Sequence, residues 1–83
     1  MIVADRPKLP TDLAGRDVRA ALERSGFSFR RQKGSHMVLA RIDPPCRVVV
    51  PDHKAVRVGT LRKIISQAGL TVEAFLDALA RDP

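Results

Sequence analysis

The sequence predicts a single α+β domain in which a helix precedes a three-stranded antiparallel sheet and further helical sequence follows it. Two observations carry this prediction. Apolar residues recur with helical spacing near both ends of the chain, whereas the middle alternates apolar and polar residues and is interrupted by Gly and Pro. A chain of 83 residues can bury one modest core but not two. We therefore expect one domain over residues 1–83, with its helices packed on one face of the sheet and residues 1–12 as a loose leader.

The first helix is expected over about residues 13–25. Val18, Ala21 and Leu22 recur at i, i+3 and i+4, which is the spacing of one face of an amphipathic helix. Gly26 is well placed to close this helix in the left-handed conformation.

Three short strands are expected between residues 27 and 50. The first spans residues 27–30 and gives way to a turn at residues 31–34. The second runs from about residue 35 to residue 42, where Asp43-Pro44-Pro45 must break it because proline cannot donate to a ladder. The third spans residues 46–50 and stops at Pro51. These strands would form an antiparallel meander.

The second strand has apolar residues on both of its faces. Alternation places His36, Val38, Ala40 and Ile42 on one face and Met37, Leu39 and Arg41 on the other. A sheet that helices cover on one side is typically polar on the other side. The pattern is consistent with a partner protein that covers part of the outer face, and the alternative is that the loop after the strand covers one end of it.

Two helices are expected after the loop at residues 52–58. Gly59-Thr60 opens the first of them, Gly69 ends it, and Thr71 can cap the second. Their apolar stripes consist of Leu61, Ile64, Ile65 and Ala68, and of Val72, Phe75, Leu76 and Leu79. The predicted order is therefore α-β-β-β-α, with the last helical region broken in two.

Positive charge is concentrated in the middle of the chain. The net charge is +6, yet residues 24–63 hold ten basic and two acidic residues, a balance of +8, and the flanks hold five basic and seven acidic residues, a balance of −2. A polyanion is the natural partner of such a segment, although the same residues could form an ordinary solvated surface. The chain has no Trp or Tyr, and its three Phe are expected in the core, so binding should rest on phosphates more than on stacked bases.

The cysteine and histidine content argues against several classes of protein. The single Cys46 cannot form an internal disulfide and is expected to be a small packed side chain. Two histidines without metal-ligand spacing make zinc improbable, so we expect no metal and no cofactor. No export signal or long apolar run is found, and we expect a cytoplasmic protein that does not bind membranes.

His36 is the strongest candidate for chemistry. It follows Lys33-Gly34-Ser35 at a glycine-marked bend with arginines on both sides. Histidine exchanges protons near neutral pH, so His36 could act as the base or the acid when RNA is cleaved by its own 2′-hydroxyl. The alternative is a turn-flanking histidine that hydrogen-bonds the backbone. His53, in the loop after Pro51, could be the second proton-transfer group, or an exposed loop histidine.

The start of the predicted helix at Gly59-Thr60 offers free backbone N–H groups, where a phosphate can dock. Arg57, Arg62 and Lys63 surround it. The alternative is a capped helix with solvated basic neighbours. The RNA contacts expected along the chain come from Arg30, Arg31, Lys33, Gly34, Arg41, Arg47, Lys54, Arg57, Gly59, Thr60, Arg62 and Lys63.

Four segments in order resemble the HicA toxin family. They are Gly26-Phe27, residues 31–36 (RQKGSH), residues 48–53 (VVVPDH) and residues 59–70 (GTLRKIISQAGL), and the likeness spans about residues 15–80. Members of that family are small basic proteins with a fold like the double-stranded-RNA-binding domain. They act as ribosome-independent mRNA interferases in type II toxin–antitoxin systems and are held in check by an antitoxin, HicB.

The resemblance implies specific roles and partners. His36 would be the catalytic histidine, His53 would match the family's frequent histidine after the strand-ending proline, and Ser35 and Lys33 would flank the site and position phosphate. The substrate would be single-stranded mRNA, a HicB-like antitoxin would be the protein partner, and DNA would be reached only through the antitoxin complex. The chain departs from the pattern at Met37 and Val38, where many relatives carry a histidine or an aromatic residue, and in the loop at residues 54–58.

Two other functions remain open at the level of the sequence. A noncatalytic RNA-binding module with the same fold would prefer duplex RNA, through phosphate and 2′-hydroxyl contacts across the minor groove. Alternatively, the chain would act chiefly as the structural partner of an acidic antitoxin that represses transcription.

Overall fold

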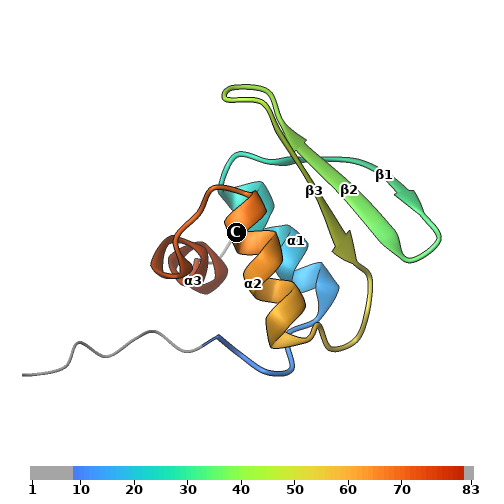
Figure 1. Cartoon of the computed structure of the whole chain (residues 1–83), viewed down its shortest axis with the longest axis vertical. Helices are drawn as coiled ribbons and strands as arrows, with labels where there is room; N and C mark the ends of the chain where they lie inside the picture. The colour runs from blue at the N-terminus through green and yellow to red at the C-terminus, as the bar shows by residue number, and fades with distance from the viewer. Residues whose placement is uncertain (1–8, 82–83) are drawn as a thin grey trace, which may run out of the picture.

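The computed structural model describes residues 9–81 and has the predicted order of elements (Figure 1). Helix α1 spans Gly15–Arg24, and strands β1, β2 and β3 span Ser28–Lys33, His36–Arg41 and Cys46–Pro51. Helices α2 and α3 follow at Val58–Gln67 and Val72–Ala80. The strands form one antiparallel sheet in the order β1-β2-β3. The predicted α+β class and the α-β-β-β-α order, with its divided last helical region, are therefore confirmed.

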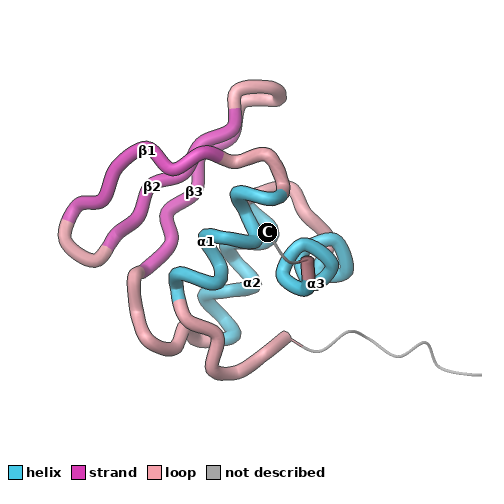
Figure 2. The backbone as a smooth tube through the Cα atoms, turned by 180° about the vertical axis from the view of Figure 1, so that it is seen from behind, coloured by secondary structure: helices cyan, strands magenta, loops and turns pink. Residues whose placement is uncertain are grey.

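The helices lie on one side of the sheet. Figures 1 and 2 show α1 and α2 between the sheet and α3, so that α3 forms an outer layer against α1. The core lies between the sheet and the helices and is almost fully buried. Its members from the sheet are Met37, Leu39, Val48 and Val50, and its members from the helices are Val18, Ala21, Leu22, Leu61, Ile64, Ile65, Phe75 and Ala78. The apolar stripes predicted from the sequence thus supply most of the core, while Val72, Leu76 and Leu79 are partly buried and pack against it.

The predicted ends of the helices also have the expected structure. Gly26 follows α1 with a φ of 101°, and the Thr71 side chain accepts a hydrogen bond from the backbone N–H of Ala74 at 3.0 Å, which caps α3. The Sγ of Cys46, half-buried at the start of β3, contacts the carbonyl of Gln67 at 3.0 Å.

The N-terminal residues differ in part from the expected leader. Residues 1–8 lie outside the described residues. Leu9, however, is only 6% exposed and belongs to the core cluster. A single apolar residue between two prolines has no periodicity, so the sequence alone did not indicate that it packs.

Strand β1 is longer than predicted, and its extension decides which way several site residues face. The predicted turn at residues 31–34 is wrong in its position, because the strand continues to Lys33 and the turn consists of Gly34 and Ser35. Phe29 pairs with Leu39 and Arg31 pairs with Val38, so one extra residue, Arg30, forms a β-bulge. The bulge reverses the alternation of side chains along the rest of the strand. Arg31 and Lys33 therefore lie on the outer face, while Gln32 lies on the face of the helices.

Candidate functional site

His36 stands at the first position of β2, directly after the turn of the β1–β2 hairpin. The register pairs it with Lys33 on one side and Pro51 on the other. Gly34, the first residue of the two-residue turn, has a φ of 58°, a conformation that side-chain-bearing residues rarely adopt. The tight turn therefore places His36, which is exposed, at the end of the outer face of the sheet.

His53 lies in the segment between β3 and α2, which is tied to two other parts of the fold. The carbonyl of His53 accepts a hydrogen bond from the N–H of Gly15 at 2.8 Å, and the N–H of Val56 donates to the carbonyl of Leu13 at 2.7 Å. The N–H of Asp52 donates to the carbonyl of Ser35 at 2.6 Å. The loop that carries His53 is thus held by the start of α1 and by the hairpin turn.

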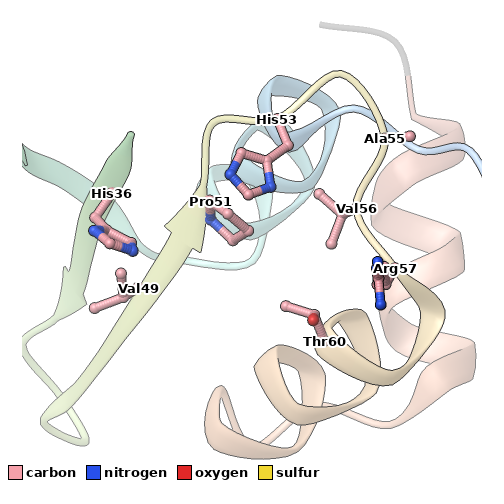
Figure 3. Close-up of a pocket in the computed structure, with 8 residues that line it drawn as sticks. All are labelled: His36, Val49, Pro51, His53, Ala55, Val56, Arg57 and Thr60. Atoms are coloured by element: carbon pink, nitrogen blue, oxygen red, sulfur yellow. The ribbon is translucent and has the colours of Figure 1, made fainter. Parts of the chain in front are cut away.

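A cavity of about 380 Å³ brings both histidines together with the start of α2 (Figure 3). Its polar lining residues are His36, His53, Arg57 and Thr60. Its apolar lining residues are Val49, Pro51, Ala55 and Val56. In Figure 3 His36 lies beside Val49, His53 lies over Pro51, and Arg57 and Thr60 stand at the opposite side of the cavity. The volume is within the range of ligand pockets, roughly 300–1,000 Å³.

The imidazole rings are free to meet a ligand. Both histidines are exposed, and no hydrogen bond joins either imidazole to another residue in the described range 9–81. In these residues, therefore, no backbone hydrogen bond holds the His36 side chain, in contrast to the alternative considered from the sequence.

The N-terminus of α2 opens into the same cavity. Arg57 is the N-cap residue of this ten-residue helix, and among the described residues no side chain caps it. The first N–H groups of a helix have no partner within the helix, and the helix dipole adds partial positive charge there. Gly59 and Thr60 are both exposed in this first turn. This end of the cavity can therefore accept an anionic oxygen.

The outer face of the sheet extends from the cavity as rows of paired residues. The row at the cavity is Lys33, His36 and Pro51, the next is Arg31, Val38 and Val49, and the third is Ser28, Ala40 and Arg47. Paired residues share a face, so three cations surround an apolar centre on the same face as His36. Val38 is 7% exposed without belonging to the helix-side core, and Val49 is 42% exposed.

Two arginines of the basic middle segment, residues 24–63, make contacts within the fold instead. Arg41 faces the helices at the opposite end of β2 from His36, with its guanidinium 4.8 Å from the centre of the Phe27 ring and its Nε 3.0 Å from the carbonyl of Pro44. Arg24 Nη1 donates to the carbonyl of Ala78 at 3.0 Å, at the end of α3. The structure therefore does not bring Arg41, one of the expected RNA contacts, to the cavity.

The other expected RNA contacts are exposed and lie at several places on the surface. Arg30 lies in the bulge of β1. Lys54 lines a hollow next to His53, together with Arg16 and Asp52. Arg62 and Lys63 lie on the exposed side of the first turns of α2. Ser35 is exposed within the hairpin turn, and its carbonyl is used by Asp52.

A family model described as HicA toxin of bacterial toxin-antitoxin matches residues 15–70. The chain belongs to the HicA toxin family. It is therefore a toxin of a bacterial toxin–antitoxin system. No curated protein matches its sequence. The matched range contains the whole cavity lining and all three strands of this HicA-family toxin.

Three residues that shape the site of this HicA-family toxin were not among the candidates read from its sequence. They are Gly15, Gln32 and Asp52, and all act through backbone approach or hydrogen bonds between distant segments. No periodicity or motif spacing carries such a signal. Two of them, Gln32 and Asp52, lie within segments that carry the family resemblance, residues 31–36 and 48–53, but the resemblance gave neither of them a role.

Across residues 9–81, no three His, Cys, Asp or Glu side chains gather closely enough to hold a metal ion. None of the helices in that range has both the length and the apolar character to cross a membrane.

Proposed function

We propose that this HicA-family toxin is an endoribonuclease that cleaves single-stranded mRNA, with His36 as its catalytic residue. The observation that carries the proposal is the cavity, which combines two unengaged imidazoles with Arg57 and the start of α2. Cleavage of RNA by its own 2′-hydroxyl needs a proton acceptor, a proton donor and positive charge around the phosphate. All three kinds of group line this one hollow.

The reaction would proceed within the RNA chain. The 2′-oxygen attacks the adjacent phosphorus and gives its proton to a base, while the bond from phosphorus to the 5′-oxygen breaks and that oxygen receives a proton from an acid. The products are a 2′,3′-cyclic phosphate and a 5′-hydroxyl. His36 transfers one of these protons, and His53 is the candidate for the other, because it lines the same cavity. Arg57 and the N–H groups at the start of α2 would hold the phosphate oxygens.

The test is incubation of the purified toxin with one RNA sequence in EDTA, once as a single strand and once as a duplex. The proposal predicts cleavage of the single strand without added metal. The alternative function, a noncatalytic RNA-binding module, predicts RNA that is shifted on a gel but stays intact, with the duplex bound more tightly. That second outcome would overturn the proposal.

The RNA strand would continue from the cavity over the outer face of the sheet, along Lys33 and Arg31. The variant Arg31→Gln/Lys33→Gln should bind RNA more weakly, and the slope of log affinity against log salt should fall by about 1.4, at roughly 0.7 per lost phosphate contact on a single strand. Filter binding at several salt concentrations measures this. Arg81→Gln, beside Asp77 on α3, removes a cation far from the sheet and serves as the control. An unchanged slope in the double variant would show that the strand takes another path.

A HicB-like antitoxin is the proposed protein partner, and the same outer face is its proposed binding surface. Val38 and Val49 form an apolar centre among Arg31, Lys33 and Arg47, a combination that suits an acidic partner with apolar anchors. Ile42, 78% exposed just after β2, extends the apolar surface away from the cavity.

Ile42→Asp should therefore weaken the antitoxin complex and leave RNA cleavage unchanged, because Ile42 is not part of the cavity. Titration of a HicB-like antitoxin into a cleavage assay measures both effects, since the variant should need more antitoxin than the wild type to be silenced. Identical titration curves would mean that the antitoxin does not use this end of the face.

A further inference from the structure

Asp52 joins the two segments that carry the histidines. Its N–H donates to the carbonyl of Ser35, the residue directly before His36, at 2.6 Å. Its carboxylate oxygen Oδ2 accepts a hydrogen bond from Nε2 of Gln32 at 3.0 Å. Asp52 is itself the residue directly before His53. One residue thus connects the β1–β2 hairpin to the loop between β3 and α2.

Gln32, in β1 of the hairpin, contacts both the hairpin turn and Asp52. Its Nε2 donates to the carbonyl of Gly34 at 3.0 Å as well as to Asp52, so the amide links the turn and the carboxylate. Gln32 reaches Asp52 because the bulge at Arg30 turns it toward the helix side, where it is paired with Met37. Without the bulge, simple alternation would point this amide to the outer face.

Asp52 is separate from the lining of the cavity that would hold RNA, although it shares one neighbouring hollow with His53. It lines two other hollows, which it shares with Arg16, and it is not among the residues that line the cavity of His36 and His53. Its contact with Arg16 Nε is long, at 4.0 Å, and the Arg16 side chain is 87% exposed, so this ion pair contributes little. The hydrogen bond from Gln32 is therefore the contact through which the Asp52 side chain acts, whereas the bond to Ser35 comes from the backbone N–H and remains in any variant of Asp52.

We propose that Asp52, held by Gln32, is a positioning residue that sets the relative placement of His36 and His53. The inference rests on the proposed ribonuclease function and concerns how its two proton-transfer groups are aligned. The β2–β3 ladder already pairs His36 with Pro51, and the side-chain link from Gln32 to Asp52 adds a contact that fixes the hairpin turn against the first residues of the His53 loop. Because a displacement of about 1 Å at a reacting group can cost roughly 100-fold in rate, a link between the loops has a direct effect on chemistry.

The test compares the steady-state kinetics of Asp52→Ala and Asp52→Asn with those of the wild type. Asp52→Ala should lower kcat by about 10- to 100-fold with a KM within about threefold of the wild type, because the cations that bind RNA remain. Asp52→Asn keeps an oxygen that can accept from Gln32 and should recover most of the rate. Asp43→Ala, in the exposed β2–β3 hairpin, removes the same charge without a link and should cleave like the wild type.

Gln32→Ala is a second, independent test of the inference. Gln32 is exposed, so its replacement leaves the core intact. It should lower kcat to a similar extent, and the double variant Gln32→Ala/Asp52→Ala should be no slower than the slower single variant, because both remove one link. Cleavage at the wild-type rate by Gln32→Ala, or multiplied effects in the double variant, would overturn the inference. A wild-type protein that cleaves no RNA would instead overturn the proposed function.

Discussion

Replacement of His36 by alanine is expected to abolish RNA cleavage while RNA binding stays within a few-fold of the wild type. A positioned acid or base typically contributes about 10²–10⁴ to a rate, and His36 is the exposed imidazole between the hairpin turn and the cavity. One imidazole adds little to a contact that several cations carry along the backbone. Single-turnover cleavage and gel-shift titration of the same preparation measure the two quantities separately.

His53→Ala is the matched comparison, since it removes the same side chain from the other part of the cavity. If His53 transfers the second proton, its loss also slows cleavage strongly and leaves binding intact. If it is an exposed loop histidine without a role in chemistry, cleavage continues at the wild-type rate. Wild-type cleavage by His36→Ala would contradict the assignment of the catalytic residue.

Gly15→Ala is expected to destabilise the protein by about 1–3 kcal/mol and to disturb the loop that carries His53. A Cβ at this position would overlap the carbonyl oxygen of Pro51 and stand 3.1 Å from the Cα of Asp52. The N–H of Gly15 also donates to the carbonyl of His53, so any shift of α1 that relieves the overlap pulls on that loop. Urea denaturation measures the free energy of unfolding, and the cleavage rate reports the disturbance of the site.

Gly59→Ala is the control for the loss of a glycine. No atom lies within 4 Å of a Cβ built at Gly59, which stands in the first turn of α2. Alanine there should leave the free energy of unfolding unchanged or raise it slightly, because alanine favours helices over glycine. Equal stabilities for Gly15→Ala and the wild type would contradict the close approach of α1 to the end of β3.

The order of the elements was predictable because it depends on residues whose spacing follows their local structure. Val18, Ala21 and Leu22 recur at the helical interval, and Asp43-Pro44-Pro45 must separate two strands. The end of β1 was not predictable in the same way. Residues 31–33 are all polar, and their place in the strand depends on pairing with β2 and on the bulge at Arg30, which is a tertiary feature.

In the candidate site, too, the residues with a local sequence pattern were predictable and those that depend on tertiary contacts were not. His36, His53, Arg57 and Thr60 were candidates from residue type and from their places beside a turn, a proline and a helix start, and the fold brings all four to one cavity. The basic residue type alone does not distinguish an arginine that binds phosphate from one that makes contacts within the fold. Arg41 was therefore counted among the expected RNA contacts. Gly15, Gln32 and Asp52 act through contacts between segments distant in the sequence, and such contacts leave no local pattern.

The chemical identity of the ends of the RNA fragments tests the central claim most directly. Fragments made by the wild-type protein in EDTA would be separated and analysed by mass spectrometry. Acid–base cleavage through the 2′-hydroxyl predicts 2′,3′-cyclic phosphate or 3′-phosphate ends paired with 5′-hydroxyl ends, and no such fragments from His36→Ala. Fragments with 3′-hydroxyl and 5′-phosphate ends would contradict the account, because they require water rather than the 2′-oxygen as the attacking group.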